Sequence, residues 1–166
     1  YINLGYHILK RTERRYEHLK TEKPASVLVC VTDQPSCRRL ILAGVEIAKT
    51  YGASVQVVSI QPEGLVSPLT ANALQNLYDV SSSLGAEMTV YFNNEPALTA
   101  AVHASKTGAI HLVSGTPGAD SNLFIETIKK LLPELPLSIV DAEGHMVTFP
   151  AFPAVSRSAV SGTDLS

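Results

Sequence analysis

The sequence predicts an α/β protein: a three-layer sandwich in which helices cover both faces of a five-stranded parallel sheet of order 3-2-1-4-5. Short apolar, β-branched runs alternate with longer amphipathic segments between residues 26 and 141. Strands separated by helices cannot pair as hairpins, so they form parallel units with right-handed crossovers. A length of 166 residues, with 45% hydrophobic and 17% charged residues, is enough for one such core.

The first two strands are expected at residues 26–32 and 54–60. The run 26–32 (SVLVCVT) is apolar without alternation, which is typical of a strand covered on both faces. Between these strands, residues 37–52 place apolar side chains on one helical stripe and end at Gly52, a residue type that often follows a helix. The second helix is expected at residues 69–85 and also ends at a glycine.

The remaining elements follow the same alternation. Residues 95–108 have Pro96 in the first turn and Gly108 just past the end, which is the usual asymmetry of a helix. The other expected elements are strands at residues 87–93, 109–115 and 136–141, and a helix at residues 121–132.

Two flanking segments lie outside the α/β domain, which we expect to span residues 24–144. Residues 1–23 are expected to form a basic amphipathic helix or a linker. Residues 145–166 are rich in Pro, Ser and Ala, and their apolar start at 145–149 is suited to an additional edge strand. The rest of this segment is expected to be a loosely ordered tail.

The basic segment 1–23 differs in charge from the rest of the chain. It carries six basic and three acidic side chains, a net charge of +3, so the remainder carries −5 of the total of −2. Such a segment can pack on the domain, lie on an anionic membrane surface, or connect to an upstream domain or membrane segment. Because acidic residues interleave with the basic ones, we favour a packing helix or a linker.

Charge and hydropathy also exclude broad classes of function. The net charge of −2 argues against nucleic acid as a partner. No apolar stretch reaches the roughly 20 residues that a membrane span needs, and no signal peptide is visible. We therefore expect a cytoplasmic protein, or the cytoplasmic part of a membrane protein.

The candidate binding site lies where the order of the strands reverses. In an open parallel sheet, ligands bind at the carboxyl ends of the strands at this point. Here the reversal falls between the first and fourth strands, so the loops 32–36 (TDQPS) and 114–121 (SGTPGADS) should face each other. The expected ligand-binding residues are Thr32, Asp33, Ser114, Gly115, Thr116, Gly118 and Ser121.

Residues 25–141 resemble the universal stress protein family. The resemblance rests on the strand alternation, on VLVCVTDQPSCRRLILAGVEIA at the first strand and helix, and on Gly115-x-x-Gly118 after the fourth strand. The first of these segments looks similar to the stress-protein-like domain of potassium-sensing histidine kinases. The resemblance implies a Rossmann-like fold of the adenine nucleotide alpha hydrolase type. It also implies a role in regulation or stress response, and a homodimer that pairs through the edge of the fifth strand.

The glycine motif of the nucleotide-binding members is only half present. In that family an Asp follows the first strand, and G-x2-G-x9-G-[ST] holds ribose and phosphates; Asp33, Gly115 and Gly118 match the first part. Nine residues after Gly118 the chain reads Ile128-Lys129, and Asp120 would repel a phosphate. The resemblance therefore implies a non-catalytic regulatory or small-ligand-binding module with a degenerate nucleotide loop and no required cofactor.

Three alternatives stay open. The chain can be a stress protein that binds ATP or AMP, with Asp33 beside the nucleoside, or it can hold a small anion. It can be the cytoplasmic regulatory domain of a membrane transporter or sensor kinase. The pair Gly115 and Gly118 can also be purely structural, a tight exit from the strand into a capped helix.

Catalytic and metal sites are not expected. His103 and His111 fall on a predicted helix and strand without ligand-type neighbours at metal-binding spacing, so we interpret them as packing residues. There is no G-x-S-x-G motif for a nucleophile. A receiver domain would need an Asp after the third strand, where Asn93 and Asn94 stand, and a dinucleotide fold would need glycines after the first strand.

Overall fold

The computed structural model describes residues 24–118 and 122–151. Six strands form one sheet of order β3-β2-β1-β4-β5-β6, so the predicted order 3-2-1-4-5 is confirmed and one strand is added. The first five strands run parallel to their neighbours, and β6 is antiparallel to β5. The strands are β1 (Ser26–Val31), β2 (Ser54–Gln61), β3 (Glu87–Phe92), β4 (Ala109–Gly115), β5 (Leu137–Val140) and β6 (Met146–Phe149).

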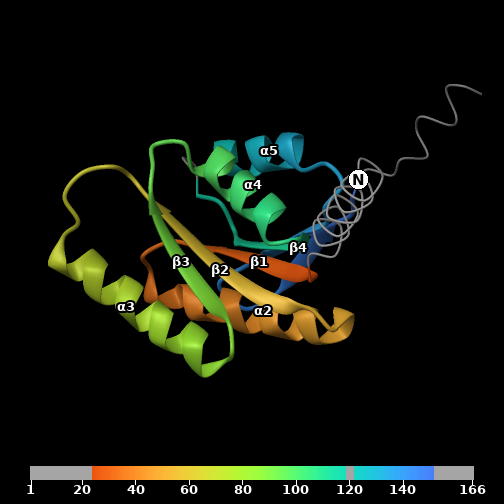
Figure 1. The fold of residues 1–166 in the computed structure, drawn as a ribbon, viewed down its shortest axis with the longest axis horizontal. Coiled ribbons are helices and arrows are strands. Elements are labelled where there is room, and N and C mark those ends of the chain that lie inside the picture. The colour runs from red at the N-terminus through yellow and green to blue at the C-terminus, as the bar shows by residue number, and fades with distance from the viewer. Residues whose placement is uncertain (1–23, 119–121, 152–166) are drawn as a thin grey trace, which may run out of the picture.

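The helices lie on both faces of the sheet, as the sequence predicts. α2 and α3 cover one face, and α4 and α5 cover the other (Figure 1). A short 3₁₀ helix, η1, precedes α2 and takes up the start of the helix expected at residues 37–52. The bounds are η1 (Pro35–Cys37), α2 (Arg38–Tyr51), α3 (Pro68–Ser83), α4 (Pro96–Lys106) and α5 (Asn122–Leu131).

Local sequence signals set the ends of these helices. α2 ends at Gly52, which takes the left-handed conformation with φ of 64° that a residue with a side chain adopts at a cost. At the start of α3 the Ser67 hydroxyl accepts a hydrogen bond from the backbone N–H of Thr70, and Pro68 occupies the first turn.

Two apolar clusters hold the three layers together. One lies between the sheet and the α2–α3 layer, and the other lies between the sheet and the α4–α5 layer. Alternate residues of β1 serve the two clusters: Val27 and Val29 face α2, whereas Leu28 faces α4 and α5, and all three are fully buried. This double burial is why the sequence of β1 is apolar without alternation.

The structure corrects the expectation that the fifth strand forms the free edge of the sheet. β6 pairs with β5 along its whole length, from Leu137 opposite Phe149 to Val140 opposite Met146. The apolar start of the C-terminal segment therefore does form an edge strand, and it belongs to the same sheet as residues 24–144. The unpaired backbone groups of β5 favour pairing with another strand, and β6 of the same chain provides that strand after a short turn.

Several sequence predictions fall outside the described residues. These are the basic helix or linker at 1–23, the tail beyond residue 151, and the loop positions Asp120 and Ser121. Among the described residues, no helix has the length and apolar character that a membrane crossing requires.

Candidate functional site

The candidate site lies at the carboxyl ends of β1 and β4, where the strand order reverses. Val29 of β1 stands opposite Val113 of β4, and the two strands run parallel, so the loops that follow them leave the same edge of the sheet. The two loops that the sequence predicts to meet are therefore neighbours at this edge of the sheet. The first turn of α2 and the end of β5 lie at the same edge, because Nε of Arg39 donates to the carbonyl oxygen of Asp141. We call the region between these loops the crevice.

Asp33 is held by the first turn of α3. The Thr70 hydroxyl donates a hydrogen bond of 2.9 Å to Oδ2 of Asp33, which is half-buried. The backbone N–H and hydroxyl of Thr70 also pair with the hydroxyl of Ser67, at 3.1 Å each. One carboxylate oxygen of Asp33 is thus fixed by an element on the β2 side of the crevice, so the side chain has a defined direction.

Thr32 precedes Asp33 and lies close to the start of α2. Its hydroxyl is 3.4 Å from the Sγ atom of Cys37, and the Cys37 side chain is buried. Thr32 is itself exposed, so its hydroxyl is open to a ligand as well as to the thiol.

Part of the loop after β4 is hydrogen-bonded to the neighbouring strand β5. The backbone N–H of Thr116 donates to the carbonyl oxygen of Val140 at 3.3 Å, so this amide is committed to β5. Ser114 is buried at the end of β4, and its hydroxyl lies 3.3 Å from the carbonyl oxygen of Gly115. Gly118 is exposed. The amide of Thr116 is therefore not among the donors that this loop can offer to a phosphate.

Arg39 is a member of the site that the sequence reasoning missed. Its Nε donates to the carbonyl oxygen of Asp141 at 2.7 Å, and its Nη1 donates to the carbonyl oxygen of Ser36 at 2.6 Å. A Cβ built on Gly115 would stand 3.6 Å from Nη2 and 3.5 Å from Cδ1 of Leu40. The guanidinium therefore lies directly against the first glycine of the loop. The sequence signal that could have identified Arg39 is an arginine in the first turn of the helix that follows the first strand.

An exposed cluster of acidic and imidazole groups lies at the same edge, in the turn between β5 and β6. Ligand atoms of Asp141, Glu143 and His145 lie within 4.8 Å of one another. Oδ1 of Asp141 accepts the backbone N–H groups of Glu143 at 3.0 Å and His145 at 2.8 Å, and His145 Nδ1 is 3.3 Å from Oδ2. Desolvation acts to raise the pKa of Asp141, but these donors and the nearby imidazole outweigh it and hold the pKa below its usual value. The turn itself accounts for this arrangement.

The two histidines that the sequence assigns to packing are buried and hydrogen-bonded. Nδ1 of His103 lies 2.7 Å from the Tyr91 hydroxyl, and Nε2 lies 3.3 Å from Oε1 of Gln56. Nε2 of His111 lies 2.7 Å from the Ser138 hydroxyl. Burial lowers the pKa of both imidazoles. They belong to the body of the sheet and its packing, as expected, and not to the crevice.

Comparison with known proteins identifies the fold. No family model matches the sequence, and no curated protein matches it. Solved structures do match. A universal stress protein from Archaeoglobus fulgidus superimposes with a TM-score of 0.51 at 17% identity, covering 75% of this chain and 97% of that one.

Two further structures agree with this result. A universal stress protein in complex with cAMP gives a TM-score of 0.52 at 17% identity, covering 73% of this chain and 99% of that one. A member of the same family from Burkholderia pseudomallei gives 0.51 at 15% identity, covering 72% and 97%. The chain therefore has the fold of the universal stress proteins, as its sequence predicts.

Proposed function

We propose that this domain, which has the fold of the universal stress proteins, is a non-catalytic regulatory module that binds an adenine nucleotide with a single phosphate group. One observation carries the proposal: the Arg39 guanidinium lies against Gly115 in the crevice where the strand order reverses. Its Nε and Nη1 are held by backbone carbonyl oxygens, and within residues 24–118 and 122–151 its Nη2 has no hydrogen-bond partner. A fixed cation with a spare donor beside a glycine suits a phosphate oxygen.

Asp33 suits the nucleoside end of such a ligand. Among the described residues, the Thr70 hydroxyl bonds Oδ2 of Asp33 and none bonds Oδ1, which suits a ribose hydroxyl or a base amino group. The similar structure that contains cAMP supports the same class of ligand. Arg39 is bonded to the residue that follows β5, and Asp33 is bonded to Thr70 of α3. Two groups anchored to different elements suit the phosphate and the nucleoside of one small molecule.

A triphosphate does not suit this site. The glycine and the following Ser or Thr that end the nucleotide motif are replaced by Ile128-Lys129, and Ile128 is buried in the packing of α5. The amide of Thr116 is committed to β5. Fewer backbone donors are therefore left for three phosphate groups, and one phosphate can be served by Arg39.

Titration calorimetry tests the proposal. We expect AMP or cAMP to bind more tightly than ATP or a cyclic dinucleotide, and Arg39→Gln to weaken binding at least tenfold, the effect of one charge-assisted hydrogen bond. Arg38→Gln is the matched control, because Arg38 is the adjacent exposed arginine. Absence of heat with every nucleotide at millimolar concentration would overturn the nucleotide proposal. Equal losses in both variants would overturn the role of Arg39.

We also propose that the module forms a homodimer, with β6 in place of the fifth strand as the pairing edge. All four side chains of β6 are exposed, including Met146, Val147 and Phe149. An exposed apolar edge strand favours pairing with another strand. Light scattering during size-exclusion chromatography should give twice the mass of 17.7 kDa. Val147→Lys should give a monomer. If the parent protein is itself a monomer at high concentration, the proposal is contradicted.

A further inference from the structure

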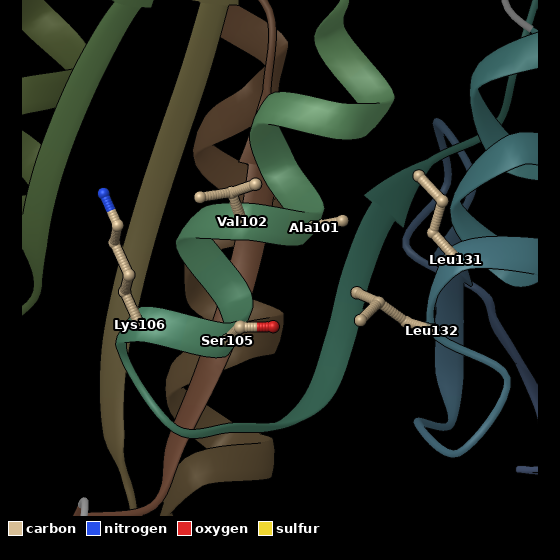
Figure 2. A pocket seen from close by; sticks show the side chains of 6 residues that line it. All are labelled: Ala101, Val102, Ser105, Lys106, Leu131 and Leu132. Carbon is tan, nitrogen blue, oxygen red and sulfur yellow. The ribbon is translucent and has the colours of Figure 1, made fainter. Parts of the chain in front are cut away.

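A groove on the face opposite α2 is the second distinct surface feature of the domain. It lies between the C-terminal halves of α4 and α5 and has a volume of about 290 Å³. In Figure 2 the side chains of Ala101, Leu131 and Leu132 point into the space between the helices, whereas Lys106 points away from it. Val102 and Leu131 are 45% and 41% exposed, so apolar side chains of both helices meet the solvent here.

The chain enters the domain at one end of this groove. The backbone N–H of Ser26 donates to the carbonyl oxygen of Gly108 at 3.0 Å, and its hydroxyl donates to the carbonyl oxygen of Thr107 at 2.8 Å. Thr107 directly follows Ser105 and Lys106, two of the residues that line the groove. The first described residue of the chain, Pro24, is therefore only two residues from an anchor at the end of α4.

The segment that precedes this anchor is long enough to fill the groove. As a helix, 23 residues span about 34 Å, and the 11 residues of α4 span about 16 Å. Three of its apolar residues, Ile8, Tyr16 and Leu19, recur at intervals of eight and three, a spacing that would place them on one stripe of a helix. Leu19 lies seven residues before Ser26, within reach of the groove in either a helical or an extended conformation.

We propose that residues 1–23 dock in the groove between α4 and α5, with the stripe of Ile8, Tyr16 and Leu19 against Val102 and Leu131. A segment tethered a few residues away meets the groove at a millimolar effective concentration. Burying two or three aliphatic or aromatic side chains is then enough to keep the groove covered. A separate partner would have to displace this segment before it could occupy the groove.

Cysteine cross-linking in the full chain tests this docking. We expect Leu19→Cys with Leu131→Cys to form an intramolecular cross-link with a short bis-maleimide at a rate independent of protein concentration. Leu19→Cys with Leu69→Cys is the control, because Leu69 is 82% exposed on α3, on the other face of the sheet. The native thiols compete little: Cys37 is buried, and burial raises the pKa of Cys30 to about 12.

Each result decides the proposal. Preferential cross-linking of the Leu131 pair within one chain supports it. Cross-links between two chains would overturn it in favour of an exchanged segment, and equal yields for the two pairs would show that the groove does not select residues 1–23.

A thermal measurement gives independent evidence. Leu131→Glu and Leu19→Glu should each lower Tm by about 3 °C or more, and the double variant should lower it no further than the larger single effect. Leu69→Glu should leave Tm unchanged. Additive effects, or no effect of Leu131→Glu, would overturn the docking.

Discussion

The Nε atom of Arg39 donates a 2.7 Å hydrogen bond to the carbonyl oxygen of Asp141, 102 residues further along the chain. This bond joins the first turn of α2 to the end of β5 across the carboxyl end of β4. The same guanidinium closes the loop before α2 through Ser36. Arg39 is therefore a structural brace for the crevice as well as the proposed partner of a phosphate.

Loss of this brace should reduce stability by a measurable amount. Hydrogen bonds from charged donors contribute about 1.5–3 kcal/mol when buried, and Arg39 is half-buried, so Arg39→Ala should lower the free energy of unfolding by about 1–2 kcal/mol. Urea denaturation measures this difference. Arg38→Ala, at the exposed neighbour, should stay within about 0.5 kcal/mol of the parent protein.

The link between Thr70 and Asp33 should affect the proposed ligand site more than the fold. Thr70→Val keeps the shape of the side chain and removes the hydroxyl that donates to Oδ2 of Asp33. We expect AMP binding to weaken about threefold to tenfold, because the Asp33 carboxylate loses a hydrogen bond that fixes its direction and not a direct contact with the ligand. Calorimetry measures this change. Thr50→Val on α2 is the control and should bind like the parent, since Thr50 bonds only the backbone of its own helix.

Two buried histidines predict how stability depends on pH. Burial lowers the pKa of His103, with Lys106 lowering it further and Glu87 opposing, and burial lowers the pKa of His111. The unfolded chain therefore binds more protons than the folded one once pH falls below about 6.5. The free energy of unfolding should be at its full value above this pH and should decrease steadily as pH falls below it.

Urea denaturation between about pH 8 and pH 5.5 checks this dependence. Each histidine should contribute about 1.4 kcal/mol for every unit by which folding lowers its pKa. His103→Gln and His111→Gln should each flatten the decrease. A stability that rises toward pH 5.5 would contradict the prediction.

The packing of α2 on β1 predicts a cost for adding a single methyl group. A Cβ on Gly44 would overlap Cγ2 of Val29 in the core. Gly44→Ala should therefore destabilise the protein by about 1–2 kcal/mol, although alanine is the better helix former by about 1 kcal/mol. Combining it with Val29→Ala should give a smaller loss than the sum of the single changes, because the new methyl then fills part of the cavity. Additive losses in thermal unfolding would contradict this view of the contact.

The order of the sheet could be predicted because its causes are local. Each parallel strand is a short apolar run, each helix has a stripe and an end signal, and crossover handedness then leaves few topologies. Gly52 and Ser67 mark helix ends within one or two residues of the predicted positions. That the loops after β1 and β4 leave the same edge of the sheet follows from the strand order alone.

The contacts that define the candidate site could not be predicted in the same way. Arg39 contacts Asp141, and Asp33 contacts Thr70, only because elements distant in the sequence pack together. Neither pair has the regular spacing by which a helix or strand can be predicted from sequence. The fifth strand was wrongly expected to be the edge. Its unpaired backbone groups favour pairing with another strand, but they do not determine whether that strand comes from the same chain or from a second copy. The residues 141–145 (DAEGH) did carry a local signal: Asp141 caps a turn, and Gly144 has φ of 85°.

Local unfolding of β6 should depend on whether the proposed dimer forms. Its attachment rests on the pairing with β5, on a 2.8 Å hydrogen bond between the hydroxyls of Thr148 and Ser138, and on the Lys129 ammonium 3.6 Å from the centre of the Phe149 ring. With every side chain exposed, this strand should be among the first parts of the sheet to open in native-state hydrogen exchange. A second copy paired with β6 would have to hold that strand in place, so amide protection at residues 146–149 should increase with protein concentration. Amide protection of β6 would thus report directly on whether the proposed dimer forms.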